Sequence, residues 1–369
     1  MTPALFTPFA LKNRQLRNRI VVPPMCQYTA VDGFTTDWHA AHYAGLARGG
    51  SSLVIVEATA VSPEGRITPG CAGLWDDRHI AGMAAVAREI KAAGAVAGIQ
   101  LAHAGRKASA NRPWEGDDHI AEGDPRGWET ISPSAIAYGA NLPQVPREMT
   151  HEDIARVQAD FVAATRRAVE AGFEWLELHF AHGYLAQSFF SVHANHRTDE
   201  YGGDLAGRSR FLLETLRAVR KVWPETFPLT ARFGVIEFDE RDEETLEEAI
   251  TLTRQFKAEG LDMLNVSVGF STPDAHIPWG PAFLAPIAEQ VHRETGLPVA
   301  SSWGIDTPLL ANGVVEKKQM DLVMVGRAQL ANPHWPYVAA LKLALDRPPW
   351  VLPPSYAHWL ERYRPAASE

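Results

Sequence analysis

Two histidines and a tyrosine stand within six positions of one another at the end of an apolar stretch. Residues 177–185 are ELHFAHGYL, and His179, His182 and Tyr184 are the reactive side chains. The two imidazoles could form half of a metal site, but their three-residue spacing puts them on opposite faces of a continuous strand. They converge only if the strand ends between them, and no obvious carboxylate or cysteine completes a ligand set. We therefore expect no metal here.

An arginine lies inside a second apolar stretch. In TARF the apolar Ala231 and Phe233 flank Arg232, so its side chain points to the opposite face of a strand from both neighbours. A buried guanidinium is costly unless an anion or a strong acceptor meets it. Arg232 therefore indicates a bound, electron-rich ligand, although a lone arginine could also belong to a structural polar layer.

Two further groups stand where apolar stretches end. Gly326 and Arg327 combine free backbone N–H groups with a guanidinium, a pairing that holds phosphate near the last two strands of many barrels. Cys26 follows PPM and could be either a reactive thiol or a small buried side chain. With Cys71 it makes two cysteines in 369 residues, too few for a disulfide framework.

The elements that must position these residues follow a repeating pattern: an amphipathic helix, a glycine, then a short apolar strand. Gly94, Gly172, Gly260 and Gly296 mark four such junctions. Eight strands are predicted, at 18–25, 52–60, 96–103, 175–180, 228–235, 262–269, 298–304 and 321–327. Eight strands in series with helices between them predict a single (β/α)8 TIM barrel domain over 1–369. A doubly wound sheet is the alternative, but no G-x-G-x-x-G follows the first strand.

The barrel prediction also says where reactive side chains should lie. They collect at the C-terminal ends of the predicted strands, the end at which barrels build active sites. A long excursion after the third strand, 104–149, is too long for an ordinary loop and should overhang that face. Thr150 and Asp153 resemble a capping box that starts a helix over about 151–171.

Composition narrows the class of protein. The chain is 46% hydrophobic and 21% charged, with 35 basic and 44 acidic residues and a net charge of −9. This balance disfavours nucleic-acid or membrane partners. No signal peptide or spanning helix is evident at the N-terminus, and few cysteines suit a reducing compartment. We expect a cytoplasmic enzyme.

Seven stretches together carry a resemblance. They are PPMCQY, EATAVSPEGRI, IQLAHAGRKAS, HFAHGYL, NHRTDEYGG, TARFG and VGRAQL. In order and spacing they resemble the old yellow enzyme family of flavin-dependent ene-reductases, and the likeness covers nearly the whole chain. Cys26 after PPM and the His-x-x-His pair are similar to the thermophilic-like subgroup of that family.

The resemblance implies a noncovalent FMN, reduced by NADPH (NADH is possible) and reoxidised by an activated alkene such as an α,β-unsaturated ketone or aldehyde. His179 and His182 would hold the substrate carbonyl, Tyr28 would contact it from above, and Tyr184 would deliver a proton. Trp303 would narrow the substrate cavity. The implied cofactor-binding residues are Pro23, Pro24, Met25, Cys26, Ala58 and Gln100 along the isoalloxazine ring, Arg232 at its N1–C2=O edge, and Trp303, Gly304, Gly326 and Arg327 toward the phosphate.

These residue types suit that chemistry. Hydride addition to the alkene builds negative charge on the carbonyl oxygen, and two N–H donors stabilise it there; loss of one such donor typically costs on the order of 3 kcal/mol. Tyr184, with an ordinary pKa near 10, stays protonated at neutral pH and can supply the proton.

Two alternatives remain, and one related class of reductases can be set aside. The same site could reduce nitro groups or nitrate esters. A flavin-free, phosphate-binding barrel lyase or isomerase is the alternative from another enzyme class. The related dienoyl-CoA reductases need an iron–sulfur cluster, which Cys26 and Cys71 cannot hold.

The resemblance also implies a homodimer. The tail over about 347–369 would pack at the subunit interface, and Trp359 would help wall the partner's substrate cavity. The proline-rich part is expected to be extended, followed by Tyr356, Trp359 and Arg362 on one face of a short helix. Alternatively, this patch could cover the chain's own helices.

Overall fold

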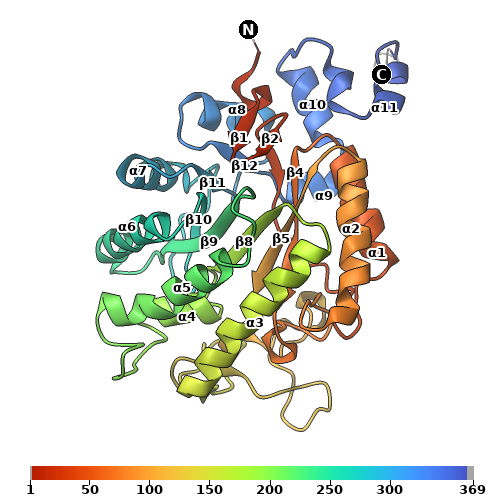
Figure 1. The fold of residues 1–369 in the computed structure, drawn as a ribbon. Helices are drawn as coiled ribbons and strands as arrows, with labels where there is room; N and C mark the ends of the chain where they lie inside the picture. Colours follow the sequence, from red (N-terminus) through yellow and green to blue (C-terminus); the bar gives the residue numbers. More distant parts are fainter. Residues whose placement is uncertain (1, 364–369) are drawn as a thin grey trace.

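Eight parallel strands close into a barrel in this computed structural model, which describes residues 2–363 (Figure 1). All eight predicted strands are confirmed, several with shorter bounds. In chain order, which is also their order around the barrel, they are β3 (Ile20–Val22), β4 (Leu53–Ala60), β5 (Val96–Ala102), β8 (Trp175–Phe180), β9 (Leu229–Ile236), β10 (Met263–Val268), β11 (Val299–Ser301) and β12 (Leu322–Met324). Pairing of β12 with β3 closes the ring.

Helices surround the barrel and cover most of its outer face (Figure 1). They are α1 (Asp37–Arg48), α2 (Ile80–Ala92), α3 (His151–Glu170), α4 (Leu185–Phe190), α5 (Leu205–Arg220), α6 (Asp242–Ala258), α7 (Ala285–Thr295), α8 (Pro308–Glu316), α9 (Arg327–Ala331), α10 (Trp335–Lys342) and α11 (Pro354–Leu360). Of these, α10 and α11 lie at one end of the molecule (Figure 1). The capping box predicted for α3 is confirmed, because Thr150 Oγ1 accepts from the Asp153 backbone and the Asp153 carboxylate accepts from the Thr150 backbone. Each of the four junction glycines has a left-handed backbone, with φ between 63° and 94°.

Two apolar cores result from this arrangement. One lies between barrel and helices, and the other fills the N-terminal half of the barrel interior around Leu53, Trp175 and Met263. An antiparallel hairpin, β1 (Phe9–Leu11) and β2 (Arg14–Leu16), packs against this inner core. The hairpin was not predicted. Because that half of the barrel is filled, a ligand can enter only from the C-terminal face.

The excursion contains short elements and is tied to the barrel. These are η4 (Gly105–Lys107), η5 (Pro113–Glu115), β6 (Ile131–Ser132) and β7 (Arg147–Glu148). Arg197, from the NHRTDEYGG stretch, donates to the carbonyl oxygens of Pro133 and Met149 at 2.9 and 2.6 Å. A part of that stretch therefore anchors the excursion.

The tail differs in part from expectation. The proline-rich part is not extended: Pro348–Val351 forms the 3-10 helix η6. Proline is compatible with the first turn of a helix, where its missing N–H would have no partner and its φ already fits. Tyr356 and Trp359 lie on α11 as expected, but Arg362 lies beyond its end. Residues 364–369 of the predicted tail lie outside the described residues.

Among residues 2–363, none of the helices has both the length and the apolar composition needed to cross a bilayer.

Candidate active site

A cavity of about 530 Å³ opens at the C-terminal ends of the strands. It is lined mainly by the segments that follow β3, β11 and β12. The predicted site residues among its walls are Pro23, Pro24, Met25, His182, Arg232, Trp303, Gly304, Gly326 and Arg327. Residues far apart in the sequence therefore meet at one barrel face.

The two histidines converge because β8 ends at Phe180, between them. His182 adopts a left-handed backbone, with φ of 64°, and its ring centroid lies 4.9 Å from that of His179. Burial, reinforced by the nearby positive charge of Arg232, lowers the pKa of both imidazoles well below the usual value. Both rings are neutral at physiological pH.

His179 has a defined tautomer. The Ala181 N–H donates to His179 Nδ1 at 3.3 Å, so Nδ1 is an acceptor and the proton resides on Nε2. His179 therefore presents Nε2–H as a donor.

Tyr184 stands beside the histidine pair. Its ring lies 5.0 Å from that of His179, and it directly precedes α4. Burial and then the nearby Cys26 raise the pKa of Tyr184 well above 10, so its hydroxyl keeps its proton. Cys26 also neighbours Tyr28, and burial raises the pKa of both of these groups. The structure thus brings all five predicted catalytic side chains near one another.

Arg232 is 5% exposed and lines the cavity. Its Nη2 donates to Ser302 Oγ at 2.8 Å and its Nε to Ser267 Oγ at 3.4 Å. Among the described residues no carboxylate forms an ion pair with this guanidinium, although the buried Glu177 carboxylate favours its charge from farther away. The guanidinium therefore has donor capacity for an electron-rich ligand in the cavity.

Gln100 lies deeper than expected for a group in contact with a cofactor. Its Nε2 donates to Glu177 Oε1 at 2.8 Å, and Asn265 Nδ2 donates to the other oxygen of Glu177 at 3.1 Å. None of the three lines the cavity. Ala58 pairs with Gln100 across β4 and β5 and likewise lies outside the cavity walls. Glu177 was missed, although it lies two positions before His179 and so shares that residue's face of β8.

A second buried carboxylate holds the segment after β3. Glu57 accepts from the Gln27 backbone N–H at 2.9 Å and from the Tyr43 hydroxyl at 3.0 Å. Burial raises the pKa of Glu57 to about 7. Because Gln27 adjoins Cys26 and precedes Tyr28, Glu57 fixes the backbone that carries both. One signal could have identified it: an acidic residue within the apolar strand predicted at 52–60.

Lys107, in the excursion, forms a hydrogen bond to the backbone of the loop that carries His182. Lys107 Nζ donates to the carbonyl oxygens of His182 and Phe270 at 2.9 and 2.7 Å, and it lies 3.9 Å from the centre of the Tyr138 ring. Burial lowers the pKa of Lys107 to about 7. Lys107 thus helps to hold His182 in its left-handed conformation.

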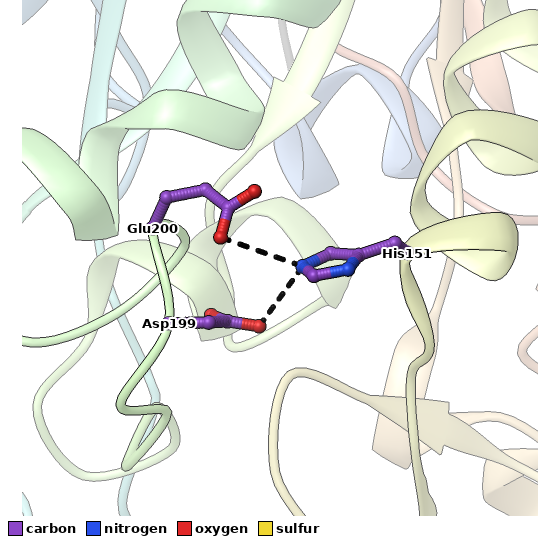
Figure 2. A group of neighbouring side chains, drawn as sticks. All are labelled: His151, Asp199 and Glu200. Atoms are coloured by element: carbon purple, nitrogen blue, oxygen red, sulfur yellow. Dashed lines mark ion pairs between the residues drawn. The ribbon is translucent and has the colours of Figure 1, made fainter.

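A separate surface cluster contains His151, Asp199 and Glu200 (Figure 2). His151 Nε2 lies 3.1 Å from Asp199 and 3.6 Å from Glu200, and among the described residues it is the one group of three side chains whose geometry could hold a metal. The Asp199 carboxylate already accepts from the Arg197 guanidinium. The cluster therefore forms a surface ion-pair network next to Arg197, the residue that anchors the excursion. It is separate from the candidate site in the barrel.

Comparison with known proteins decides the family. The profile of the NADH:flavin oxidoreductase / NADH oxidase family matches residues 4–346. The chain belongs to this family. Within the family, it is 39% identical over 347 residues to an NADPH dehydrogenase of Geobacillus thermodenitrificans, covering 94% of this chain and 96% of that protein. An NADPH dehydrogenase of Bacillus subtilis is 37% identical over 350 residues, covering 94% and 97%.

Solved structures of this old yellow enzyme family share the fold. Morphinone reductase in complex with tetrahydroNAD superposes with a TM-score of 0.76 at 26% identity, covering 96% of this chain and 94% of that one. A 2-naphthoyl-CoA reductase superposes with a TM-score of 0.83 at 26% identity; it covers 95% of this chain, which spans 54% of that longer protein. The chain is thus an oxidoreductase of a flavin-binding family whose relatives use NADPH or NADH.

Proposed function

We propose that the protein is an FMN-dependent, NAD(P)H-driven ene-reductase that reduces the C=C bond of α,β-unsaturated carbonyl compounds. The net reaction converts NADPH, a proton and an enone to NADP⁺ and the saturated ketone. The observation that carries this proposal is the arrangement of two neutral imidazoles and a protonated tyrosine beside the cavity.

The residues present fit a noncovalent FMN. Pro23 to Met25 offer an apolar wall for a planar ring, and Arg232 offers a guanidinium that lines the cavity where a reduced flavin ring is electron-rich. Gly326 and Arg327 begin α9, whose first N–H groups have no intrahelical partner and suit a phosphate.

Gly304, which also lines the cavity, is held by its own packing. Its backbone is left-handed, with φ of 68°, and a Cβ there would lie 2.2 Å from the Gly280 carbonyl oxygen. Only glycine allows the chain to turn so closely beside the cavity.

When bound, FMN would supply the hydride that adds to the alkene carbon. His179 and His182 would donate to the carbonyl oxygen, where negative charge develops; each such donor is worth about 3 kcal/mol of transition-state stabilisation. Tyr184 would protonate the neighbouring carbon. Trp303, whose ring lies 6.0 Å from that of His182, would limit the size of the substrate. The two donors would equally fit the oxygens of a nitro group or a nitrate ester, so these compounds are the second candidate substrates.

We also propose that a homodimer is the catalytic unit, in the cytoplasm. Trp359 is 75% exposed, and α11 lies at the opposite end of the molecule from the excursion (Figure 1). It therefore does not reach the chain's own cavity and could wall only a partner's. Leu341, Trp350 and Tyr356 are also exposed, and together with Trp359 they give this end an apolar surface suited to a subunit interface.

The experiment is anaerobic reduction of the purified protein by NADPH, followed by a panel of enones, nitro compounds and nitrate esters. The expected result is a yellow protein that NADPH bleaches and that 2-cyclohexenone reoxidises with formation of cyclohexanone. A colourless protein would instead favour a flavin-free barrel lyase or isomerase. A yellow protein reoxidised by nitro compounds alone would favour the second class of substrate.

A further inference from the structure

Ser267, on β10, is the point where three groups of the candidate site meet. Its Oγ lies 2.8 Å from His182 Nε2, 3.4 Å from Arg232 Nε and 3.3 Å from Trp303 Nε1. The residue is fully buried. Ser267 lies outside the seven stretches that carry the family resemblance, within the strand sequence NVSVG.

The valence of a hydroxyl group decides the direction of these bonds. A serine oxygen has one hydrogen to donate and two lone pairs to accept with, whereas the guanidinium Nε of Arg232 and the indole Nε1 of Trp303 can only donate. These two donors occupy both lone pairs. The hydroxyl hydrogen therefore goes to the remaining neighbour, His182 Nε2, which must accept it.

We propose that Ser267 is a positioning residue that fixes the tautomer of His182, so that its Nδ1–H faces the substrate. This inference rests on the proposed function and deepens it. Among the described residues, no group is hydrogen-bonded to His182 Nδ1, and this atom is not one of the buried unpaired atoms. Since His182 lines the cavity, Nδ1 is open to it.

The two histidines then present different ring nitrogens to one substrate oxygen. His179 donates through Nε2–H, because Ala181 occupies its Nδ1, and His182 donates through Nδ1–H. If His182 instead carried its proton on Nε2, Nδ1 would turn a lone pair toward the carbonyl oxygen, and one of the two donors would become a repulsive acceptor. Ser267 removes that possibility without touching the substrate.

The direct test is ¹⁵N NMR of histidine-labelled, FMN-loaded enzyme, because ¹⁵N shifts distinguish a protonated from an unprotonated ring nitrogen. The His182 signals are assigned by their loss in His182→Asn. The expected result is a protonated Nδ1 in the native enzyme and a shift toward Nε2 protonation in Ser267→Ala. Ser302→Ala is the matched control: it removes an acceptor from Arg232, but the hydrogen bond of the His182 ring goes to Ser267, so the His182 signals should not move.

A double-mutant cycle adds a kinetic readout. Ser267→Ala should lower kcat/KM for an enone about tenfold, the equivalent of one ordinary hydrogen bond, and Ser267→Thr should restore it. In a His182→Asn background, where an amide N–H donates without tautomers, Ser267→Ala should have little further effect. A native His182 protonated on Nε2, unchanged signals in Ser267→Ala, or an equal loss in both backgrounds would each overturn the inference. Absence of FMN or of enone reduction in the native protein would refute the proposed function instead.

Discussion

At the scale of single residues, burial sets the chemistry of the candidate site. The same desolvation that keeps His179 and His182 neutral keeps Tyr184 protonated. Neutral imidazoles are N–H donors and a protonated tyrosine is an acid. One buried environment therefore suits both the stabilisation of the carbonyl oxygen and the protonation of the carbon in the proposed reaction.

Tyr184→Phe tests the acid. The variant should retain FMN and its reduction by NADPH but reduce alkenes roughly 10²-fold more slowly, the low end of general-acid contributions. Quinones need no protonation at carbon, so the variant should reduce them at the native rate. Stopped-flow reoxidation of the reduced enzyme with an enone and with a quinone measures the two rates. An equal loss with the two acceptors would remove Tyr184 from this role.

Cys26→Ala tests whether the thiol acts as a nucleophile. Because burial raises the pKa of Cys26, it should remain a thiol, a poor nucleophile, and should act by modulating the flavin and the substrate contacts. The variant is expected to keep measurable turnover and to show a shifted FMN reduction potential. A folded, yellow and completely inactive variant would point to covalent thiol chemistry.

At the scale of the elements, strand ends place the reactive groups, and the pH dependence of stability reports on their packing. His103, at the end of β5, is buried; its Nδ1 accepts from the Gly105 N–H, and its Nε2 has no hydrogen-bond partner among residues 2–363. Burial lowers the pKa of His103 to about 4, below the value of about 6.5 in the unfolded chain.

Between these two pKa values the unfolded chain binds more protons at His103 than the folded protein does, so the contribution of His103 to stability is constant above about pH 6.5 and falls as the pH drops toward 4. Denaturant unfolding of the FMN-loaded protein at about pH 7.5 and about pH 5 measures this loss. His103→Gln should show a smaller acid loss than the native protein. The same loss in both proteins would assign the acid sensitivity to other groups.

The elements were largely predictable and some of their contacts were not. The eight strands followed from apolar runs, junction glycines and polar strand ends, signals that are local in the sequence. The hairpin β1–β2 was missed because strands of three residues leave no clear alternation. Ser267 and Glu57 were missed because their importance comes from tertiary partners, and 348–351 was wrongly expected to be extended because proline also suits a first helical turn.

At the scale of the whole molecule, the exposed apolar end predicts assembly. Removing the chain after Leu352 should give monomers that keep FMN but bind substrate less tightly, because Trp359 would no longer reach the partner's cavity. Light scattering and enone KM values measure the two effects. Leu309→Ala, which removes a side chain of similar exposure (72%) on α8, is the control and should stay dimeric. A truncated protein that remains dimeric with unchanged kinetics would refute the shared site.

The most direct test of the proposed reaction follows the two hydrogens separately. Reduction of 2-methylcyclohexenone by the FMN-loaded enzyme is run once with [4-²H]NADPH, carrying deuterium on the transferred face, in H₂O, and once with unlabelled NADPH in D₂O. The site predicts deuterium at the β-carbon in the first product and at the α-carbon in the second, because the hydride comes from the cofactor and the proton from Tyr184. Solvent deuterium at the β-carbon, or no saturated product at all, would contradict the proposed ene-reductase.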